Sequence, residues 1–102
     1  MKYHNKKTTI DGHTFDSKKE GDRYLELKQF QADGIISVLR LQVPFELIPK
    51  QQGERACKYI ADFVYMECGS LIVEDVKGVR TPVYKLKKKL MLERHGIKIR
   101  EV

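Results

Sequence analysis

The sequence is poor in the residues that mark several common protein classes. It has no tryptophan, two cysteines and three prolines in 102 residues. Cys57 and Cys68 form neither a C-x-x-C pair nor part of a zinc-ligand array, which argues against a disulfide framework and a zinc site. We expect both cysteines to be small buried apolar residues with no chemistry of their own.

Long apolar runs are also absent. No stretch is long and apolar enough for a membrane span, and no apolar segment follows the basic N-terminus as it would in a signal peptide. We therefore expect a cytoplasmic protein. His4, His13 and His95 share no spacing, so a metal site built from histidines is not expected.

Acidic residues are outnumbered by basic ones. The chain holds 20 Lys and Arg against 14 Asp and Glu, which gives a formal net charge of +6. A length of 102 residues suits one domain with a single modest core. A basic excess on such a domain favours a polyanionic partner such as nucleic acid.

Two strand-like runs, residues 59–66 and 71–78, organise the rest of the chain. Both are rich in β-branched and aromatic residues, and the short segment between them suits a hairpin loop. Each run also carries ionisable side chains, although burying an unpaired carboxylate costs several kcal/mol. We therefore expect a cation to compensate these carboxylates.

Side chains alternate between the two faces of a strand, and this separates the ionisable residues. Asp75 and Lys77 lie on one face of the second run, and Glu74 lies on the other. One register of the hairpin places Asp62 beside Asp75 and Lys77. Each residue alone would suit an ordinary surface position, but two converging carboxylates repel each other unless a divalent cation lies between them. The three together therefore predict a metal site.

The N-terminal part is predicted to lead into a helix. Residues 1–7 form a basic flexible arm, and Asp11-Gly12 between two β-prone runs predicts a hairpin over residues 8–15. The helix that follows begins at Ser17 and ends at Gly34. Glu20 has two candidate roles: a capping-box partner of the Ser17 amide, or an acidic site residue at the rim of the buried stripe.

Residues 35–48 are predicted to form another extended segment. Pro44 inside it indicates an edge position, a bulge or a bend. Gln42 and Glu46 are secondary site candidates, because both are polar side chains that could face the same cleft. A polar loop over residues 49–55 then leads into the strand that carries Asp62.

A second helix is predicted after the Asp75 strand. It begins at Thr81-Pro82, an N-cap followed by proline at the first helical position, and it ends at His95-Gly96. Its buried face is expected to hold Val83, Leu86 and Leu90. Residues 97–100 alternate as a last strand, and the connection through a helix makes that strand parallel to the Asp75 strand.

Lysines of this helix are candidate contacts for DNA phosphates. Lys85, Lys88 and Lys89 are expected to project away from the apolar face. A lysine run is usually only a solvated helix face, but this one directly follows Lys77, which favours phosphate contacts. Lys6 and Lys7 of the N-terminal arm are expected to contribute in the same way.

The predicted order of elements, with acidic residues on the middle hairpin, resembles the PD-(D/E)XK nucleases of the restriction-endonuclease-like fold. Asp62 stands where that family has its first Asp, and Asp75-Val76-Lys77 matches its (D/E)-x-K. Glu74 is a rival to Asp75 for the middle acidic position and is therefore a secondary site candidate, and only the alternation of faces selects Asp75. Ala61 takes the place of the proline that precedes the first Asp in some members. Glu20 resembles the additional acidic residue that many members carry on the first helix.

Three longer runs are similar to a family of small phage and prophage proteins of unassigned function. These runs are Phe15-Asp16-Ser17-Lys18-Lys19-Glu20, Gln42-Val43-Pro44-Phe45-Glu46-Leu47 and Val73-Glu74-Asp75-Val76-Lys77-Gly78. The spacing of the acidic residues is also similar to that of the phage Holliday-junction endonucleases. The resemblance therefore implies an α/β fold of αβββαβ order with a mixed sheet. It also implies a protein that acts in the cytoplasm of a phage host.

The resemblance also implies an activity, which is metal-dependent hydrolysis of DNA phosphodiester bonds. Glu20, Asp62, Asp75 and the carbonyl of Val76 would hold Mg²⁺, for which Mn²⁺ can substitute. Lys77 would orient the nucleophile or stabilise the transition state. Such nucleases leave a 5′-phosphate and a 3′-hydroxyl. Because one site cuts one strand, symmetric cleavage of a duplex or a junction requires a homodimer.

Two alternatives share the same residues. One is a DNA-binding or scaffold protein that keeps the nuclease fold without catalysis, for which removal of Asp62 or Lys77 would leave its cellular activity intact. The other is a nuclease that acts on RNA, which differs only in its substrate. The sequence does not separate duplex, single-stranded and branched DNA as targets.

Overall fold

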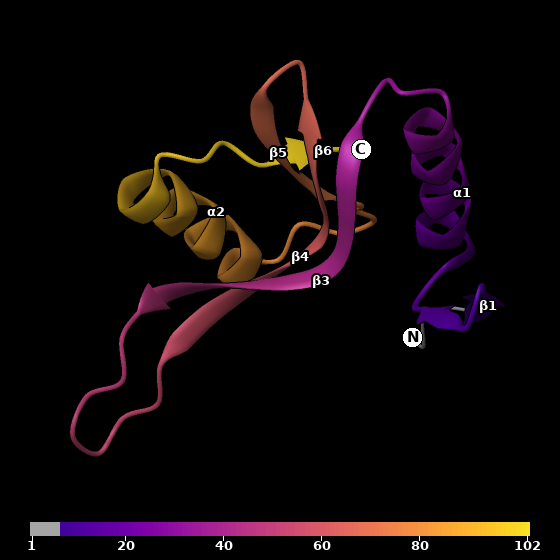
Figure 1. Cartoon of the computed structure of the whole chain (residues 1–102). Helices are drawn as coiled ribbons and strands as arrows, with labels where there is room; N and C mark the ends of the chain where they lie inside the picture. The colour runs from indigo at the N-terminus through magenta and orange to yellow at the C-terminus, as the bar shows by residue number, and fades with distance from the viewer. Residues whose placement is uncertain (1–6) are drawn as a thin grey trace.

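The chain forms a mixed four-stranded sheet with one helix on each side (Figure 1), as seen in a computed structural model that describes residues 7–102. The elements in chain order are β1 (Thr8–Ile10), β2 (His13–Phe15), α1 (Lys18–Ala32), β3 (Ser37–Ile48), β4 (Cys57–Glu67), β5 (Ser70–Asp75), α2 (Pro82–His95) and β6 (Arg100–Glu101). The predicted α/β class and element order are confirmed. Strands β1 and β2 form a separate hairpin, as predicted.

The central hairpin of β4 and β5 is confirmed, and its turn is tighter than expected. Only Cys68 and Gly69 connect the strands, and both have positive φ angles, 51° and 77°. This conformation matches the twist of a two-residue hairpin. Cys68 is exposed and Cys57 is only half-buried. The expectation of two buried cysteines is therefore wrong, because Cys68 lies at the tip of the turn.

Strand β3 lies at the edge of the sheet, whose strand order is β3-β4-β5-β6. Its pairing with β4 shifts register near both ends, and Figure 1 shows it bending sharply along its length. Gln42 has a φ of 52° in the middle of the strand, a conformation that is uncommon for a residue other than glycine. The edge position and irregularity predicted from Pro44 are thus confirmed.

The buried core is divided into two clusters, one against each helix. Tyr84 and Met91 anchor the α2 cluster, whereas Tyr24 and Leu27 anchor the α1 cluster. Strand β4 supplies both: Tyr59, Ala61 and Val64 belong to the α2 cluster, and Phe63 and Tyr65 to the α1 cluster. Along β4, the odd-numbered residues belong to the α2 cluster up to Ala61 and to the α1 cluster from Phe63 onward. The change of side occurs at Asp62, which therefore lies in the bent part of the sheet.

Helix α2 is rotated relative to the sequence prediction. Val83 and Leu86 are 63% and 58% exposed, whereas Tyr84 and Met91 are buried. The Tyr84 ring packs near Tyr59, with 6.5 Å between the ring centroids. A tyrosine ring buries more apolar surface than valine or leucine does, so this aromatic contact sets the rotation of the helix.

Helix α1 begins as predicted and packs closely on the β1–β2 hairpin. The Ser17 hydroxyl accepts a hydrogen bond from the Glu20 amide at 3.1 Å, which makes Ser17 the N-cap. A Cβ atom added at Gly21 would lie 3.2 Å from Ile10 Cδ1. Glycine at this helical position is explained by close packing on β1.

The C-terminal segment returns to the sheet beside β5. Strand β6 runs parallel to β5, with Glu74 opposite Arg100 and Asp75 opposite Glu101. Parallel pairing is confirmed, although the strand begins at Arg100 and not at residue 97. Within the described part of the chain, neither helix has the length and apolarity needed to cross a membrane.

Candidate functional site

A cleft of about 800 Å³ lies between the start of α1, strand β4 and the segment that follows β5. All four residues predicted to be catalytic line it: Glu20, Asp62, Asp75 and Lys77. These residues come from three separate parts of the chain, so only the fold brings them together.

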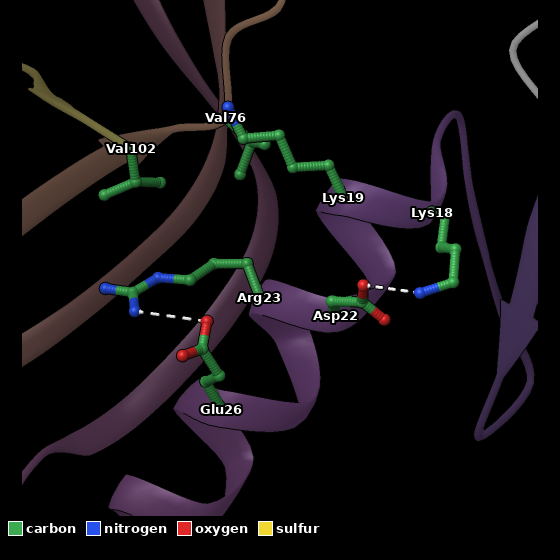
Figure 2. Close-up of a pocket in the computed structure, with 7 residues that line it drawn as sticks. All are labelled: Lys18, Lys19, Asp22, Arg23, Glu26, Val76 and Val102. Carbon is green, nitrogen blue, oxygen red and sulfur yellow. Dashed lines mark hydrogen bonds and ion pairs between the residues drawn. The ribbon is translucent and has the colours of Figure 1, made fainter.

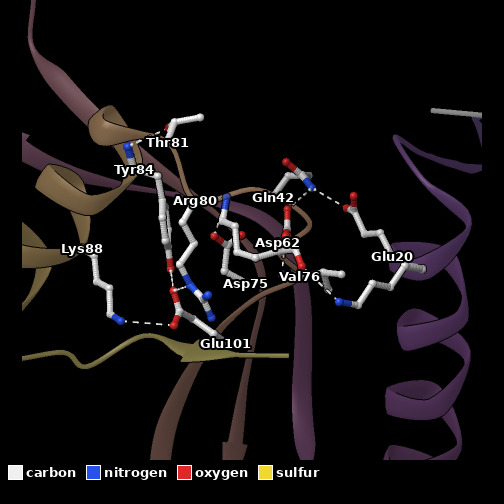
Figure 3. Close-up of polar contacts among 12 residues, drawn as sticks. Glu20, Gln42, Asp62, Asp75, Val76, Arg80, Thr81, Tyr84, Lys88 and Glu101 are labelled. Carbon is white, nitrogen blue, oxygen red and sulfur yellow. Dashed lines mark hydrogen bonds and ion pairs between the residues drawn. The ribbon is translucent and has the colours of Figure 1, made fainter. Parts of the chain in front are cut away.

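The register of the central hairpin places the two aspartates together. Phe63 pairs with Glu74, so Asp62 and Asp75 are opposite each other one step further along. Asp62 Oδ2 accepts a hydrogen bond from the backbone amide of Val76 at 2.8 Å, and both aspartates appear in Figure 3. This amide directs the Asp62 carboxylate toward the end of β5.

Asp75 is nearly inaccessible to solvent and incompletely bonded. Its exposure is 2%, and Oδ2 lies 2.8 Å from Lys77 Nζ. Despite this ion pair, Oδ2 accepts no well-directed hydrogen bond from any residue that the structure describes. The Tyr59 hydroxyl is also buried without a hydrogen-bond partner among these residues. A buried carboxylate oxygen with unused capacity is a suitable ligand for a cation.

Gln42 connects the carboxylates of α1 and β4. Its Nε2 donates to Glu20 Oε2 at 3.2 Å and lies 3.5 Å from Asp62 Oδ1, as Figure 3 shows. The strained backbone of Gln42 is of the kind found at functional sites. The amide N–H group thus lies between the two carboxyl groups.

Of the two roles predicted for Glu20, the structure supports the acidic residue at the cleft, because among the described residues its carboxylate bonds to Gln42 and not to the Ser17 amide. Its backbone amide bonds to the Ser17 N-cap, whereas its carboxylate faces the cleft and accepts from Gln42. The residue is 7% exposed. Burial, with the nearby Asp16 charge adding to it, raises the pKa of Glu20. Glu20 therefore brings a carboxylate to the cleft, while its main-chain amide is capped by the Ser17 hydroxyl.

The pKa of Asp62 is also raised, to about 8. Burial is the main cause, followed by a hydrogen bond with Asp75, to which a protonated Asp62 can donate. The neighbouring Asp75 and Glu20 charges act in the same direction. Without a cation, the site therefore favours a neutral Asp62.

Lys77 is held by contacts that sequence reasoning missed. Its ammonium lies 4.0 Å from the centroid of the Tyr84 ring, a cation–π contact. Its carbonyl accepts a hydrogen bond from Lys19 Nζ at 3.0 Å, which connects the start of α1 to this segment. No local pattern could have indicated Tyr84 or Lys19, because both contacts depend on the packing of the helices.

Glu74, the neighbour of Asp75, points to the opposite side of the sheet, as strand alternation predicted. It is 0% exposed and accepts from Arg23 Nε at 2.6 Å and Arg23 Nη2 at 2.9 Å. The Tyr65 hydroxyl also donates to it. Figure 2 shows the same Arg23 beside a pocket of about 360 Å³ that also includes Lys19 and Val76. Glu74 therefore has a structural ion pair, and as a secondary site candidate it is not brought to the cleft.

Glu46, the other secondary candidate on β3, lies beyond the bend in that strand. It pairs with Lys58 on β4, its side chain is exposed, and its carbonyl lies 2.7 Å from the His95 ring. The expectation that Glu46 faces the cleft is therefore wrong, whereas the same expectation for Gln42 is supported by its bond to Glu20.

The predicted DNA contacts differ in their surroundings. Lys85 and Lys89 are exposed on α2, whereas Lys88 is half-buried and pairs with Glu101 at 3.2 Å. Lys7 is exposed immediately before β1. Lys6 lies outside the described residues.

The chemistry of the donor set fits a hard divalent cation. Within residues 7–102, no three His, Cys, Asp or Glu side chains are drawn closely enough together to form a ready metal cage. The carboxylates of Glu20, Asp62 and Asp75 nevertheless share one cleft, and oxygen ligands of this kind are those that Mg²⁺ and Mn²⁺ prefer. The Gln42 amide and the Lys77 ammonium now contact the oxygens that a cation would bind.

Comparison with known proteins gives one match. A family model described as "Protein of unknown function (DUF1064)" matches residues 1–101. No curated protein and no solved structure gives a significant match.

Proposed function

We propose that this chain, which belongs to the DUF1064 family of proteins of unknown function, is a metal-dependent DNA endonuclease with a restriction-endonuclease-like core. One observation carries the proposal: Glu20, Asp62, Asp75 and Lys77 line a single cleft. Three carboxylates with one ammonium form a phosphodiesterase site of the PD-(D/E)XK type, which the sequence resembles. The cleft lies on a basic chain, as expected for a DNA-binding protein.

Glu20, Asp62 and Asp75 would hold the metal, with the Val76 carbonyl as a further candidate ligand. When bound, Mg²⁺ lowers the pKa of coordinated water and neutralises charge on the scissile phosphate. The Val76 amide fixes one oxygen of Asp62, which orients the carboxylate before a ligand arrives. Such prior orientation reduces the cost of binding.

Lys77 supplies a positive charge from a protein side chain, in addition to that of the bound metal. The Tyr84 ring and the Asp75 carboxylate both contact its ammonium, so the group has a defined position at the cleft wall. From there it can donate hydrogen bonds to the attacking water or to a phosphate oxygen. Charge that develops on the phosphate during hydrolysis is thereby stabilised.

A cleavage panel tests this proposal. Duplex, single-stranded and four-way-junction DNA, and a single-stranded RNA, are incubated with Mg²⁺, Mn²⁺ or EDTA. Wild type should cut at least one DNA substrate only with a metal, leaving 5′-phosphate ends, and Asp75→Asn should lower the rate by about 10²-fold or more. Asp22→Asn is the matched control, because Asp22 is exposed and, within residues 7–102, forms an ion pair with Lys18 alone.

Three results would contradict parts of the proposal. Absence of cleavage by wild type on every substrate, with DNA binding retained, would favour the non-catalytic DNA-binding or scaffold role. Equal cleavage by wild type and Asp75→Asn would show that the activity does not depend on the proposed metal site. Cleavage of RNA without cleavage of any DNA would show that the substrate is RNA.

A further inference from the structure

A second concave surface, here called the α2 groove, lies beside the cleft. Its volume is about 480 Å³. Five cations surround it: Arg80, Lys85, Lys88, Lys89 and Lys98. Tyr84 and Leu92 complete its lining. Lys98 was not among the expected DNA contacts. The sequence placed it in the last strand, whereas in the structure it lies just before β6 and lines the groove.

The charge of the α2 groove is only partly compensated. Arg80 lies 3.1 Å and Lys88 3.2 Å from the Glu101 carboxylate, which also accepts from the Tyr84 hydroxyl at 2.7 Å. The Arg80 and Tyr84 hydrogen bonds hold the pKa of Glu101 down at about 2. Glu101 therefore pairs with two of the five cations, and the groove keeps an excess of positive charge.

Three of these cations are available to a ligand. Lys85, Lys89 and Lys98 form no ion pair with any residue that the structure describes, and all three are exposed. Ammonium groups that make no internal pair bind phosphate without first losing a partner. The ligand that suits them is a chain of phosphates, because they are spread along the groove.

The α2 groove continues from the cleft. Thr81 lines the cleft and the adjacent Arg80 lines the groove. The Tyr84 ring contacts Lys77 of the cleft and also borders the groove. In the view of Figure 3, Tyr84 and Arg80 lie between Lys88 and Asp75. A strand whose phosphate occupies the cleft can therefore extend along α2.

We infer that the α2 groove binds the sugar–phosphate backbone of the substrate on one side of the scissile phosphate, so that the substrate is a polynucleotide and not a small phosphodiester. The inference rests on the proposed nuclease function for the identity of the cleft, but not for binding in the groove. From Lys85 to Leu92 the helix rises about 10 Å, which corresponds to roughly three phosphates of one strand.

This contact reads no base sequence. Four of the five cations are lysines, which bind phosphate as compact point charges, and contacts to the phosphate backbone carry no sequence information. Binding should therefore depend strongly on salt and weakly on sequence. It should also occur without a metal, because no carboxylate of the cleft takes part.

Metal-free binding tests the inference. Fluorescence anisotropy of a labelled DNA oligonucleotide is measured in EDTA, at salt concentrations between about 50 and 200 mM. The double variant Lys85→Gln/Lys89→Gln should bind at least about tenfold more weakly at the lowest salt, and its salt slope should fall by roughly 1.5 for the two lost contacts. Lys50→Gln/Arg55→Gln changes the net charge equally on the exposed loop between β3 and β4 and is the matched control.

The control decides between a site and a general charge effect. The inference holds if the groove variant loses affinity and the control binds like wild type. If both double variants lose affinity equally, or if neither does, the α2 groove is not the binding surface. Circular dichroism of both variants verifies that any loss does not come from unfolding.

The cleavage reaction separates this inference from the proposed function. The wild-type rate should fall when the substrate is shortened to a dinucleotide, whereas the groove variant should cut long and short substrates at similar low rates. Metal-free binding that depends on the groove, with no cleavage by wild type, would overturn the proposed function alone. Cleavage by wild type that the groove variant matches on long substrates would overturn the groove alone.

Discussion

Replacing Asp62 with asparagine should stabilise the metal-free protein while removing its response to metal. Asparagine has nearly the same volume, its carbonyl can still accept from the Val76 amide, which lies 2.8 Å from Asp62 Oδ2, and its amide can donate to Asp75. The only large change is that position 62 can no longer become negative. The variant therefore isolates the cost of burying that charge.

The raised pKa of Asp62 fixes the sign of the stability difference between wild type and Asp62→Asn. It also fixes the pH range over which this difference develops. Burial raises this pKa from 3.8 to about 8, so the folded protein binds this proton more tightly than the unfolded chain does. The stabilisation is complete below about pH 4 and is lost as the pH rises toward 8. Wild type should thus become less stable than Asp62→Asn as the pH increases through this range.

The magnitude follows from the size of the shift. A difference of about four pKa units corresponds to at most roughly 6 kcal/mol. Asp62 is only half-buried, and water in the cleft screens its charge, so we expect about 1–3 kcal/mol at pH 9. Near pH 5 the two proteins should differ by less than about 1 kcal/mol.

Urea denaturation at both pH values, in EDTA and in Mg²⁺, measures the free energies of unfolding of wild type and Asp62→Asn. Metal at ten times its Kd should stabilise wild type by about 1.4 kcal/mol and should leave Asp62→Asn unchanged. Asp22→Asn should behave as wild type in every condition. The reasoning is refuted if Asp62→Asn is the less stable protein at pH 9 in EDTA, or if Mg²⁺ stabilises it as much as wild type.

Substitutions at three further residues test neighbouring parts of the account. Lys77→Met should lower the single-turnover cleavage rate by about 10²–10³-fold while calorimetry shows Mn²⁺ binding retained; an unchanged rate would exclude a catalytic role for the ammonium. Glu74→Gln leaves the Arg23 guanidinium without its carboxylate and should lower the free energy of unfolding in urea by about 3 kcal/mol, with the stabilisation by Mg²⁺ intact. A loss of that response would place Glu74 in the site after all. Tyr84→Phe removes the donor to Glu101, at 2.7 Å, and should cost about 1 kcal/mol of stability, but its ring still supports Lys77, so cleavage should stay near the wild-type rate. Tyr84→Leu should lose cleavage, and equal rates for the two variants would contradict a role for the ring.

Local periodicity explains why the centre of the site could be predicted. The alternation of side chains on β5 is a property of any strand, and it separated Asp75 and Lys77 from Glu74. The turn residues of the β4–β5 hairpin then limit the registers that bring Asp62 opposite Asp75. The N-cap residues Ser17 and Thr81 act within one helical turn, so their sequence signals were also sufficient.

Longer-range packing explains what the sequence left undetermined. Gln42 and Glu46 have the same parity on β3, yet Gln42 donates to the cleft carboxylate of Glu20, whereas Glu46 is exposed opposite Lys58. The positive φ of Gln42 interrupts the regular strand between them, and no local pattern predicts it. The rotation of α2 depends on Tyr59, which is 25 positions before Tyr84 in the chain. With apolar and basic residues interleaved around that helix, no pattern within it marks Tyr84 as the buried residue.

A titration of the metal-free protein with Mn²⁺, followed by electron paramagnetic resonance, tests most directly whether these carboxylates share a cation. Wild type should bind one or two ions saturably, Mg²⁺ should displace them, and Asp22→Asn should bind equally well. Asp62→Asn and Asp75→Asn should each lose the bound ions. If wild type binds Mn²⁺ no more tightly than Asp75→Asn does, the carboxylates do not form a metal site, and the proposed chemistry is wrong.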